Sequence, residues 1–399
     1  MSTDSSWGTR AESRSISLRR MRVVVDARPA LDPRPTGVGV YARELVSGLS
    51  KADASMGVVA WYLHARGLLH PRRFFDEPVI ESPSRFPARL YGPISWRLGF
   101  PKVEWLCGGF DLLVATNFLP PATAMPERVI MVVHDLAFER MPETAPHHDA
   151  RWRRRFASSL ESAAGVIVPS RSARDDLLAG HSIDPSKVHV VHHGVSASER
   201  PSARAIADAR ARFGVPERYA LFVGGLEPRK NVERLARAFL EVDTDAALVI
   251  AGGPVRWLPH AAVRMEETFE RLDPGNRIIR TGYLTDGNRD ALLAGATLLA
   301  YPSLYEGFGF PVLEGFAAGV PVLTSEASSL PEVAGEAAVL VDPMDEDQIA
   351  AGLARLLDDA ELRDRLRQAG RDRISSFTWE ACARSTAEAL RAAYAAAHG

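Results

Sequence analysis

Cysteine is nearly absent from this sequence of 399 residues, which contains only Cys107 and Cys382. The two lie far apart and form no CxxC pair, so the sequence excludes a disulfide framework and a zinc site built from cysteines. So few cysteines fit a reducing compartment, and we therefore expect a cytoplasmic protein.

The chain also lacks a strong charge of either sign and a long apolar run. It has 48 Lys and Arg against 50 Asp and Glu, a formal net charge of −2. Nucleic-acid binders usually carry a strongly basic domain, so we expect no nucleic-acid partner. No apolar run approaches the roughly 20 residues that a membrane-spanning helix needs. Residues 1–20 are rich in Ser and Arg without an apolar core, which predicts a disordered leader rather than a signal peptide.

Short apolar runs alternate with helical patterns along the rest of the chain, which is typical of α/β domains with parallel sheets. At roughly 150 residues per domain, the length predicts two or three domains. We expect irregular structure over 71–101 and a basic helix over 149–163. Strands are expected at 23–25, 57–63, 111–116, 128–134, 165–169, 188–192, 219–223, 247–251, 277–281, 298–301, 321–324 and 338–341.

The alternating pattern divides into two series of similar length. We predict an N-terminal domain over 21–195, a linker over 196–216, a C-terminal domain over 217–378, and a final helix over 379–399 that crosses back to the N-terminal domain. The predicted fold class is α/β, with two Rossmann-like parallel-sheet domains facing a deep interdomain cleft. Ligands of such sheets bind at the carboxyl ends of the strands, so the cleft is the expected site.

A glycine-rich stretch, PSLYEGFGFPVLE at residues 302–314, follows one expected strand and leads into a helix. Gly307 and Gly309 let the backbone approach a ligand, and N–H groups at a helix start can hold an anion. Glu306 lies in the loop, and Glu314, eight residues later, lies inside the helix. Two carboxylates so placed can bind hydroxyl groups along an extended ligand. The alternative is that Glu306 is an acid near the helix cap and that Glu314 is a solvated residue of the helix.

Two cations, Arg229 and Lys230, follow the glycine pair Gly224 and Gly225 after another expected strand. A diphosphate ligand carries two negative charges, and it gains more when it is the leaving group. Positioned Arg and Lys side chains stabilise that developing charge. The alternative is that Arg229 and Lys230 only lie at a solvated helix N-terminus, although the helix dipole disfavours cations there.

Together these segments resemble retaining glycosyltransferases with the GT-B fold, and in particular glycosyltransferase family 4. Residues 302–314 are similar to the E-x7-E motif of that family, and 223–231 to its diphosphate-binding loop. Residues 319–322 and 330–333 resemble parts of its nucleotide domain, 36–41 its N-terminal glycine loop, and His134-Asp135 its catalytic-histidine segment. The resemblance covers the chain from Arg22 onward and implies a hexosyltransferase, most similar to members that use GDP-mannose.

The resemblance also implies roles for individual residues. His134 would contact the 6-hydroxyl of the donor sugar, with a structural His–Asp pair as the alternative. The expected catalytic residues are His134, Arg229, Lys230 and Glu306. The expected donor-binding residues are Gly37, Gly39, Gly224, Gly225, Gly282, Tyr283, Gly307, Phe308, Gly309 and Glu314. Glu306 and the amides of Phe308 and Gly309 would bind the hexose, and Glu314 the ribose. The implied reaction needs no metal and no cofactor, because Arg and Lys neutralise the diphosphate.

Other interpretations have less support. The pattern Gly37-x-Gly39-x-x-Ala42 matches a dinucleotide motif, but the preceding loop is too long and no acid ends the second strand. Asp243-Thr244-Asp245 resembles a metal-binding DxD motif and is better explained as a turn. A sugar-nucleotide epimerase, a phosphorylase and a non-catalytic nucleotide-sugar-binding homologue remain as alternatives, and the intact acids and cations argue against the last.

The expected partners are a nucleotide-sugar donor and a glycan, lipid-linked or small-molecule hydroxyl acceptor. Two basic-aromatic stretches, 85–97 and 151–156, suit peripheral contact with the inner face of a membrane. A solvated helix face is the alternative. The sequence leaves the donor base, the sugar, the acceptor and the oligomeric state open.

Overall fold

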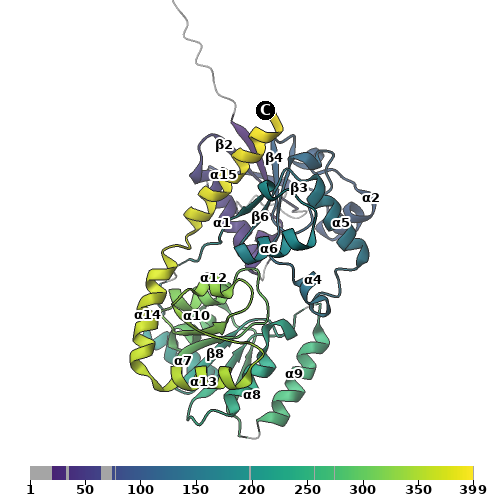
Figure 1. The fold of residues 1–399 in the computed structure, drawn as a ribbon. Helices are drawn as coiled ribbons and strands as arrows, with labels where there is room; N and C mark the ends of the chain where they lie inside the picture. Colours follow the sequence, from purple (N-terminus) through teal and green to yellow (C-terminus); the bar gives the residue numbers. More distant parts are fainter. Residues whose placement is uncertain are drawn as a thin grey trace, which may run out of the picture.

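The computed structural model describes residues 20–32, 36–63, 74–76, 78–196, 199–255, 257–273 and 275–398. It contains two parallel sheets, each in its own domain, stacked one above the other in Figure 1. The α/β fold class with two Rossmann-like parallel-sheet domains is therefore confirmed. The expected leader, residues 1–20, lies outside the described residues except for Arg20.

The first sheet has seven strands in the order β3-β2-β1-β4-β5-β6-β7. Side chains alternate between its faces, so Val23 and Val25 belong to one buried cluster and Val24 to another. Burial on both faces explains the continuous apolar runs of its strands. The strands are β1 (Met21–Asp26), β2 (Met56–Leu63), β3 (Ile80–Ser84), β4 (Leu112–Ala115), β5 (Val129–Val132), β6 (Gly165–Val168) and β7 (Val188–Val190).

Helices cover both faces of this sheet (Figure 1). The α-helices are α1 (Gly37–Ala52), α2 (Ala88–Leu98), α3 (Val103–Cys107), α4 (Ala137–Arg140), α5 (Ala150–Ser162) and α6 (Arg171–Gly180). Single 3-10 turns are η1 (Pro29–Leu31), η2 (Pro126–Arg128), η3 (Pro142–Thr144) and η4 (Pro185–Lys187).

The prediction of irregular structure over 71–101 is wrong in part, because β3 and α2 lie within it. Strand β3 is an edge strand and is partly exposed, so it lacks a continuous apolar run. Helix α2 contains Gly92 and Pro93, which disfavour a helix interior. Tertiary packing overrides that preference, since Tyr91 of α2 is buried with its ring centre 5.6 Å from that of Trp61.

The second sheet has six strands in the order β10-β9-β8-β11-β12-β13. They are β8 (Tyr219–Val223), β9 (Ala247–Ala251), β10 (Ile278–Gly282), β11 (Leu298–Tyr301), β12 (Val322–Ser325) and β13 (Ala338–Val341). The helices are α7 (Ala203–Phe213), η5 (Pro228–Lys230), α8 (Val232–Leu240), α9 (Pro259–Leu272), α10 (Asp286–Gly295), α11 (Phe310–Ala317), α12 (Leu330–Ala334), α13 (Glu346–Asp358) and α14 (Ala360–Ile374). Helix α7 occupies part of the expected linker and packs against α10.

The last helix, α15 (Trp379–His398), follows α14 of the second domain and packs against α1 of the first (Figure 1). Trp379 and Leu390 of α15 belong to the buried cluster of the first domain. The indole Nε1 of Trp379 donates a hydrogen bond of 3.1 Å to Ser196 Oγ, near the end of the first domain. Among the described residues, none of the helices has the length and apolar character needed to cross a membrane.

Candidate active site

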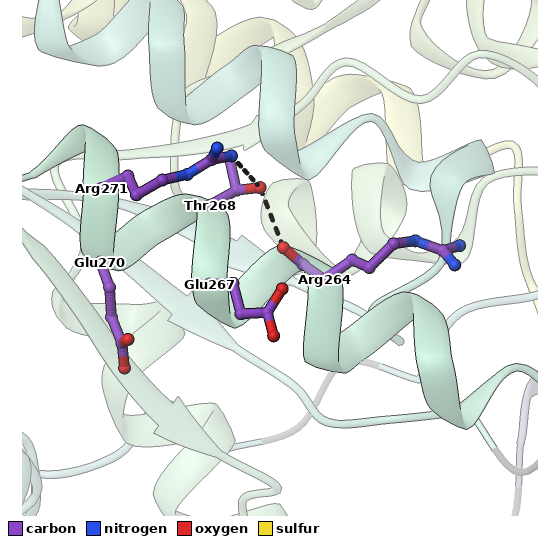
Figure 2. A pocket seen from close by; sticks show the side chains of 5 residues that line it. All are labelled: Arg264, Glu267, Thr268, Glu270 and Arg271. Carbon is purple, nitrogen blue, oxygen red and sulfur yellow. Dashed lines mark hydrogen bonds between the residues drawn. The ribbon is translucent and has the colours of Figure 1, made fainter.

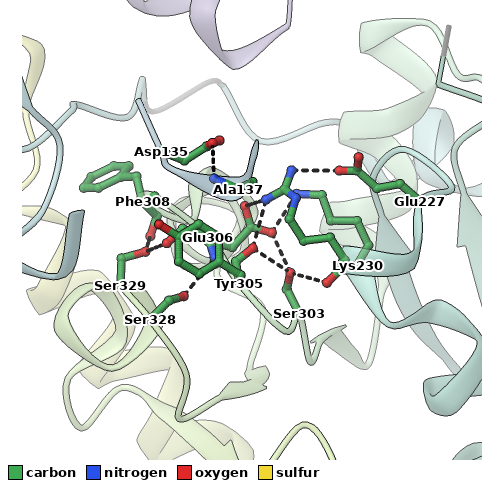
Figure 3. A network of polar contacts seen from close by, with 12 residues as sticks. Asp135, Ala137, Glu227, Lys230, Ser303, Tyr305, Glu306, Phe308, Ser328 and Ser329 are labelled. Carbon is green, nitrogen blue, oxygen red and sulfur yellow. Dashed lines mark hydrogen bonds and ion pairs between the residues drawn. The ribbon is translucent and has the colours of Figure 1, made fainter. Parts of the chain in front are cut away.

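A buried ion cluster joins the ends of β8 and β11 (Figure 3). Lys230 Nζ lies 2.6 Å from Glu306 Oε1, and Arg229 Nη1 lies 2.8 Å from Glu306 Oε2. Arg229 Nη2 also pairs with Glu227 Oε1 at 2.7 Å. Each of these four side chains is at most 12% exposed. The cluster places two cations and two carboxylates together where water competes weakly for their hydrogen bonds.

Two neighbouring hydroxyl groups fix the carboxylate of Glu306. Tyr301 donates a hydrogen bond of 2.8 Å and Ser303 one of 2.7 Å to Glu306 Oε1, while Tyr301 accepts one of 2.6 Å from Lys230. Burial alone would raise the pKa of Glu306, but the charges of Arg229 and Lys230 outweigh it and lower the pKa to about 2. Glu306 is therefore ionised at neutral pH and serves as the counter-ion of both cations.

Hydrogen bonds to backbone carbonyl groups also join the loop that follows β8 to the loop that follows β11. Leu304 N donates to Arg229 O at 2.8 Å, and the amide of Asn231 donates to Pro302 O at 3.0 Å and to Pro343 O at 2.7 Å. Asn231 has φ +61°, in the left-handed region where Asn is the commonest residue after Gly. Neither Asn231, the last residue of the motif 223–231, nor Tyr301, just before the motif 302–314, was among the predicted site residues.

Glu314 lies in a different environment from Glu306. It sits in α11, and among the described residues its carboxylate forms no hydrogen bond within the protein. Burial raises the pKa of Glu314, and the nearby charge of Arg289 on α10 offsets this only in part. The carboxylate is thus held near a cation with its hydrogen-bonding capacity unused, which suits a ligand hydroxyl group.

Gly307 packs directly on the first domain. A Cβ at position 307 would lie 1.8 Å from the carbonyl oxygen of His134, which follows β5. Ser170, at the start of α6, donates a hydrogen bond of 2.7 Å to Gly307 O. Only glycine fits this contact. Gly309, with φ +114°, is the residue before α11, and a Cβ there would lie 2.7 Å from Leu330.

Tyr305 is a second contact between the domains that the sequence analysis did not identify. Its hydroxyl donates to Asp176 Oδ2 at 2.8 Å and accepts from Leu136 N at 3.2 Å. Asp176 in turn pairs with Arg140. The sequence signal for Tyr305 was its place beside Glu306 in the motif loop.

Glu332 of α12 forms a third contact between the domains. One carboxylate oxygen accepts a hydrogen bond of 2.9 Å from Arg171 N, and the other lies 2.8 Å from His192 Nε2. Burial would raise the pKa of Glu332, but these partners lower it. The three contacts together fasten the loop 303–309 and α12 to the carboxyl edge of the first sheet.

His134 uses both ring nitrogens inside the first domain. Its Nε2–H donates to Thr116 O at 2.7 Å, so Nδ1 is the acceptor and faces His193 Nε2 at 3.4 Å. Burial lowers the pKa of His134, which keeps the ring neutral. His193 Nδ1 is buried without a hydrogen-bond partner among the described residues. The His134 ring therefore has no free nitrogen in this arrangement.

Besides Gly307 and Gly309, the predicted glycines lie in three places. Gly37 and Gly39 are in the first turn of α1, and a Cβ at Gly37 would lie 3.0 Å from Phe310 of α11. Phe308, by contrast, is buried near His193, with ring centres 5.0 Å apart. These residues border the same junction between the domains as Gly307.

Gly224 and Gly225 follow β8, where the neighbouring Gly252 approaches so closely that its Cβ would lie 1.7 Å from Gly224 O. Gly282 has φ +67° at the end of β10, and Tyr283 beside it is 65% exposed. Gly282 and Tyr283 also lie at the carboxyl edge of the second sheet, but none of the hydrogen bonds found among the described residues joins the Tyr283 side chain to the ion cluster.

Among the residues that the structure describes, the features outside this junction do not form a comparable site. The shallow pocket in Figure 2 is lined by five side chains of α9 alone, none of them a predicted site residue: Arg264, Glu267, Thr268, Glu270 and Arg271. Asp245 of the DxD-like segment pairs with Arg218. Within the described parts of the chain, no three His, Cys, Asp or Glu side chains are grouped to hold a metal ion.

Comparison with known proteins identifies both domains. Residues 35–199 match the family model "Glycosyltransferase Family 4", and residues 205–373 match "Glycosyl transferases group 1". The O-antigen chain mannosyltransferase B of Escherichia coli is 27% identical over 397 residues, covering 93% of this chain and 100% of the relative. The MMP α-(1→4)-mannosyltransferase of Mycolicibacterium hassiacum is 28% identical over 398 residues, covering 88% and 93%.

Solved structures show the same fold. Sucrose-phosphate synthase from Thermosynechococcus elongatus superposes with a TM-score of 0.72 at 21% identity. HepE of Anabaena, in complex with UDP and glucose, superposes with a TM-score of 0.70 at 16% identity. Each comparison covers 94% of this chain and 100% of the other. Because family models match both domains and mannosyltransferases align with nearly the whole chain, this protein belongs to glycosyltransferase family 4 and is a hexosyltransferase with the GT-B fold.

Proposed function

We propose that this enzyme transfers mannose from GDP-mannose to a hydroxyl group of a glycan, lipid-linked or small-molecule acceptor, with retention of configuration. The observation that carries the proposal is the buried cluster of Arg229, Lys230 and Glu306 at the junction of two parallel sheets. The names of two relatives, both mannosyltransferases, support the choice of sugar.

Arg229 and Lys230 would bind the donor diphosphate. When the bond between the anomeric carbon and the phosphate oxygen breaks, negative charge grows on the leaving GDP, and the two cations stabilise it. The anomeric carbon forms its new bond to the acceptor oxygen on the same face, and the acceptor proton passes to the departing phosphate oxygen. This step balances without an enzyme nucleophile.

Glu306 would act chiefly by positioning these cations, because both of its oxygens already bind them. A cation held in place before the reaction needs little reorganisation as charge develops. The amides of Phe308 and Gly309 would meet the hexose. His134 would border the sugar, and we do not assign it the role of a general base, since both ring nitrogens are engaged.

Glu314 would bind the ribose hydroxyl groups, because its carboxylate forms no hydrogen bond with the described residues and lies near the charge of Arg289. Calorimetry of a Glu314→Ala variant should then show weaker binding of GDP and of GDP-mannose alike. Unchanged affinity for GDP would remove this role. Gly37, Gly39, Gly224, Gly225, Gly282 and Tyr283 would line the rest of the donor path.

A thermal-shift series with GDP-mannose, UDP-glucose, ADP-glucose and dTDP-glucose tests the donor, because a ligand that binds only the folded state raises the melting temperature by mass action. We expect the largest rise with GDP-mannose. UDP-glucose is the second candidate, since HepE has been solved in complex with it. A rise with UDP-glucose alone would replace the mannosyl assignment. Proton NMR of the product then reports the anomeric configuration.

The proposal also includes turnover without a metal and a cytoplasmic location. Addition of a chelator should leave transfer unchanged, and a loss restored by Mn²⁺ would contradict the proposed role of the two cations. The location has the support of two buried free thiols, Cys107 and Cys382, which a reducing compartment would maintain.

A further inference from the structure

The ring of His193 lies between the two domains and touches both walls of the proposed sugar site. His193 follows β7 and is 1% exposed. Its Nε2 atom faces His134 Nδ1 at 3.4 Å, and its ring centre lies 5.0 Å from that of Phe308. His134 belongs to the first domain, and Phe308 belongs to the motif loop of the second. The position of His193 therefore affects both groups that would border the hexose.

The contacts of the two imidazole rings fix the places of their protons. A carbonyl oxygen only accepts, so His134 donates from Nε2 to Thr116 O, 2.7 Å away. Burial lowers the pKa of His134 and that of His193, so each ring is neutral at pH 7 and carries one proton. His134 Nδ1 is then an acceptor, and His193 donates to it from Nε2. The contact holds only while His193 supplies that N–H group.

Aromatic rings from three other elements hold His193 in place. Its ring centre lies 4.4 Å from that of Tyr41 in α1 and 5.4 Å from that of Phe310 in α11, and Trp379 of α15 stacks at 6.5 Å. The backbone is fixed as well, because a Cβ on Gly194 would lie 2.3 Å from Trp379 N. A ring confined in this way keeps its N–H group directed at one acceptor.

Packing alone does not account for histidine at this position. The second ring nitrogen of His193, Nδ1, is buried and forms no hydrogen bond with a described residue. An unpaired polar atom in such a site lowers stability, whereas a phenylalanine ring would fill an aromatic shell without that cost. The property that distinguishes His193 from phenylalanine here is thus its Nε2–H group.

We propose that His193 is a positioning residue for the transfer reaction, whose Nε2–H group holds the His134 ring beside the donor hexose. The inference rests on the proposed function, because it requires a sugar next to His134. A ring that is in place before the donor binds needs little rearrangement when the sugar arrives. The nucleotide part of the donor would be held by other residues, so we expect His193 to affect turnover and not the binding of GDP.

Two substitutions separate the N–H group of His193 from its ring. His193→Phe keeps a ring and removes the donor, whereas His193→Gln removes the ring and places an amide N–H near the position of Nε2. The rate measured is the release of GDP from GDP-mannose with water in place of the acceptor. We expect kcat to fall on the order of tenfold in His193→Phe, because a buried group loses its hydrogen-bond partner. His193→Gln should recover most of that loss.

Three further measurements distinguish positioning from support of the fold. Calorimetry should show the same affinity for GDP in both variants and in the unmodified enzyme. The melting temperature of His193→Phe should be unchanged or higher, because this variant removes the unpaired Nδ1. His189→Phe is the matched control on β7, since His189 is partly exposed and forms no hydrogen bond with a described residue. It should keep its turnover.

Nitrogen-15 NMR of the free protein reports the same hydrogen bond without any donor. The shift of His134 Nδ1 should stay close to that of the unmodified protein in His193→Gln and move towards that of a free acceptor nitrogen in His193→Phe. Unchanged turnover or an unchanged shift in His193→Phe, or equal losses in both variants, would overturn the role of His193. A loss of GDP affinity that parallels the loss of turnover would also overturn it.

The two proposals fail in different ways. If the unmodified enzyme releases no GDP from GDP-mannose, the donor assignment is wrong, and the NMR comparison still tests the contact between His193 and His134. If the unmodified enzyme is active and the two variants of His193 do not differ, the donor assignment stands and the positioning role is wrong.

Discussion

Gly307 meets the carbonyl oxygen of His134 so closely that a Cβ on Gly307 would lie 1.8 Å from it. The hydrogen bond from Ser170 to Gly307 O, 2.7 Å long, fixes the same peptide from the other side. The motif loop of the second domain therefore rests directly on the ends of strands in the first. This glycine is required by contact between the domains, whatever ligand the loop also binds.

Substitution of Gly307 by Ala should separate the domains at this point. Since a shift of about 1 Å in a reacting group costs on the order of 10²-fold in rate, we expect kcat/KM to fall by that factor. The melting temperature should fall as well, because Gly307 is buried against the backbone of the first domain. Steady-state kinetics and calorimetric melting measure the two effects.

Gly92→Ala is the matched control for this variant. Gly92 lies in α2, and a Cβ at this position would meet nothing within 4 Å, so alanine fits there. Alanine in a helix should leave activity unchanged and raise stability slightly. Equal losses of activity in both variants would contradict the role given to the Gly307 contact.

Lys230→Ala removes one of the two cations that face Glu306. Loss of one positioned charge in a water-poor site should lower turnover on the order of 10²–10³-fold. Single-turnover kinetics with saturating donor measure this step. Lys51→Ala, at the exposed end of α1, serves as the control and should retain full activity. Turnover near that of the unmodified enzyme in Lys230→Ala would refute the diphosphate role.

Glu306 and Glu314 should affect stability in opposite directions as the pH changes. The folded-state pKa of Glu306, about 2, lies below its ordinary value of 4.5. The contribution of ionised Glu306 to the free energy of unfolding is thus fully present above about pH 5. It is lost as the pH falls through the folded-state pKa. The pKa of Glu314 is raised by burial, so ionising it in the folded state opposes folding as the pH rises above 4.5.

Urea unfolding at about pH 7 and about pH 4 distinguishes the two carboxylates. Glu306→Gln should destabilise the protein more at the higher pH, because it removes the counter-ion of Arg229 and Lys230. Glu314→Gln should be neutral or stabilising at the higher pH, since it removes the cost of a buried charge. The same pH dependence in both variants would contradict the two assignments.

Tyr305→Phe tests the contact between α6 and the motif loop. Without the hydroxyl, Leu136 N and Asp176 each lose a partner. Such a loss costs about 1–2 kcal/mol in a buried site. A double-mutant cycle with Asp176→Asn, read from kcat/KM and from the free energy of unfolding, gives the coupling. Additive effects in both measurements would show that the two side chains act independently.

The sequence predicted the repeated strands because each one carries a local signal. Buried parallel strands such as β5 and β11 are continuous apolar runs, and the polar residues that follow them mark the carboxyl edge of a sheet. By this reasoning Arg229, Lys230 and Glu306 could be expected near one another. Helix α2 was missed because Gly92 and Pro93 give the opposite local signal, and tertiary contacts such as the packing of Tyr91 on Trp61 stabilise it.

By itself, the sequence determined the two-sheet architecture, the family and the loops that bear charged groups, because periodicity and motif spacing are properties of neighbouring residues. Tertiary structure alone decided that Glu306 is the counter-ion of two cations, that Gly307 rests on His134, and that Tyr305 reaches Asp176. Burial and charge at a site depend on segments that are far apart in the chain. Residue spacing does not encode the distances between such segments, which docking of the two domains sets.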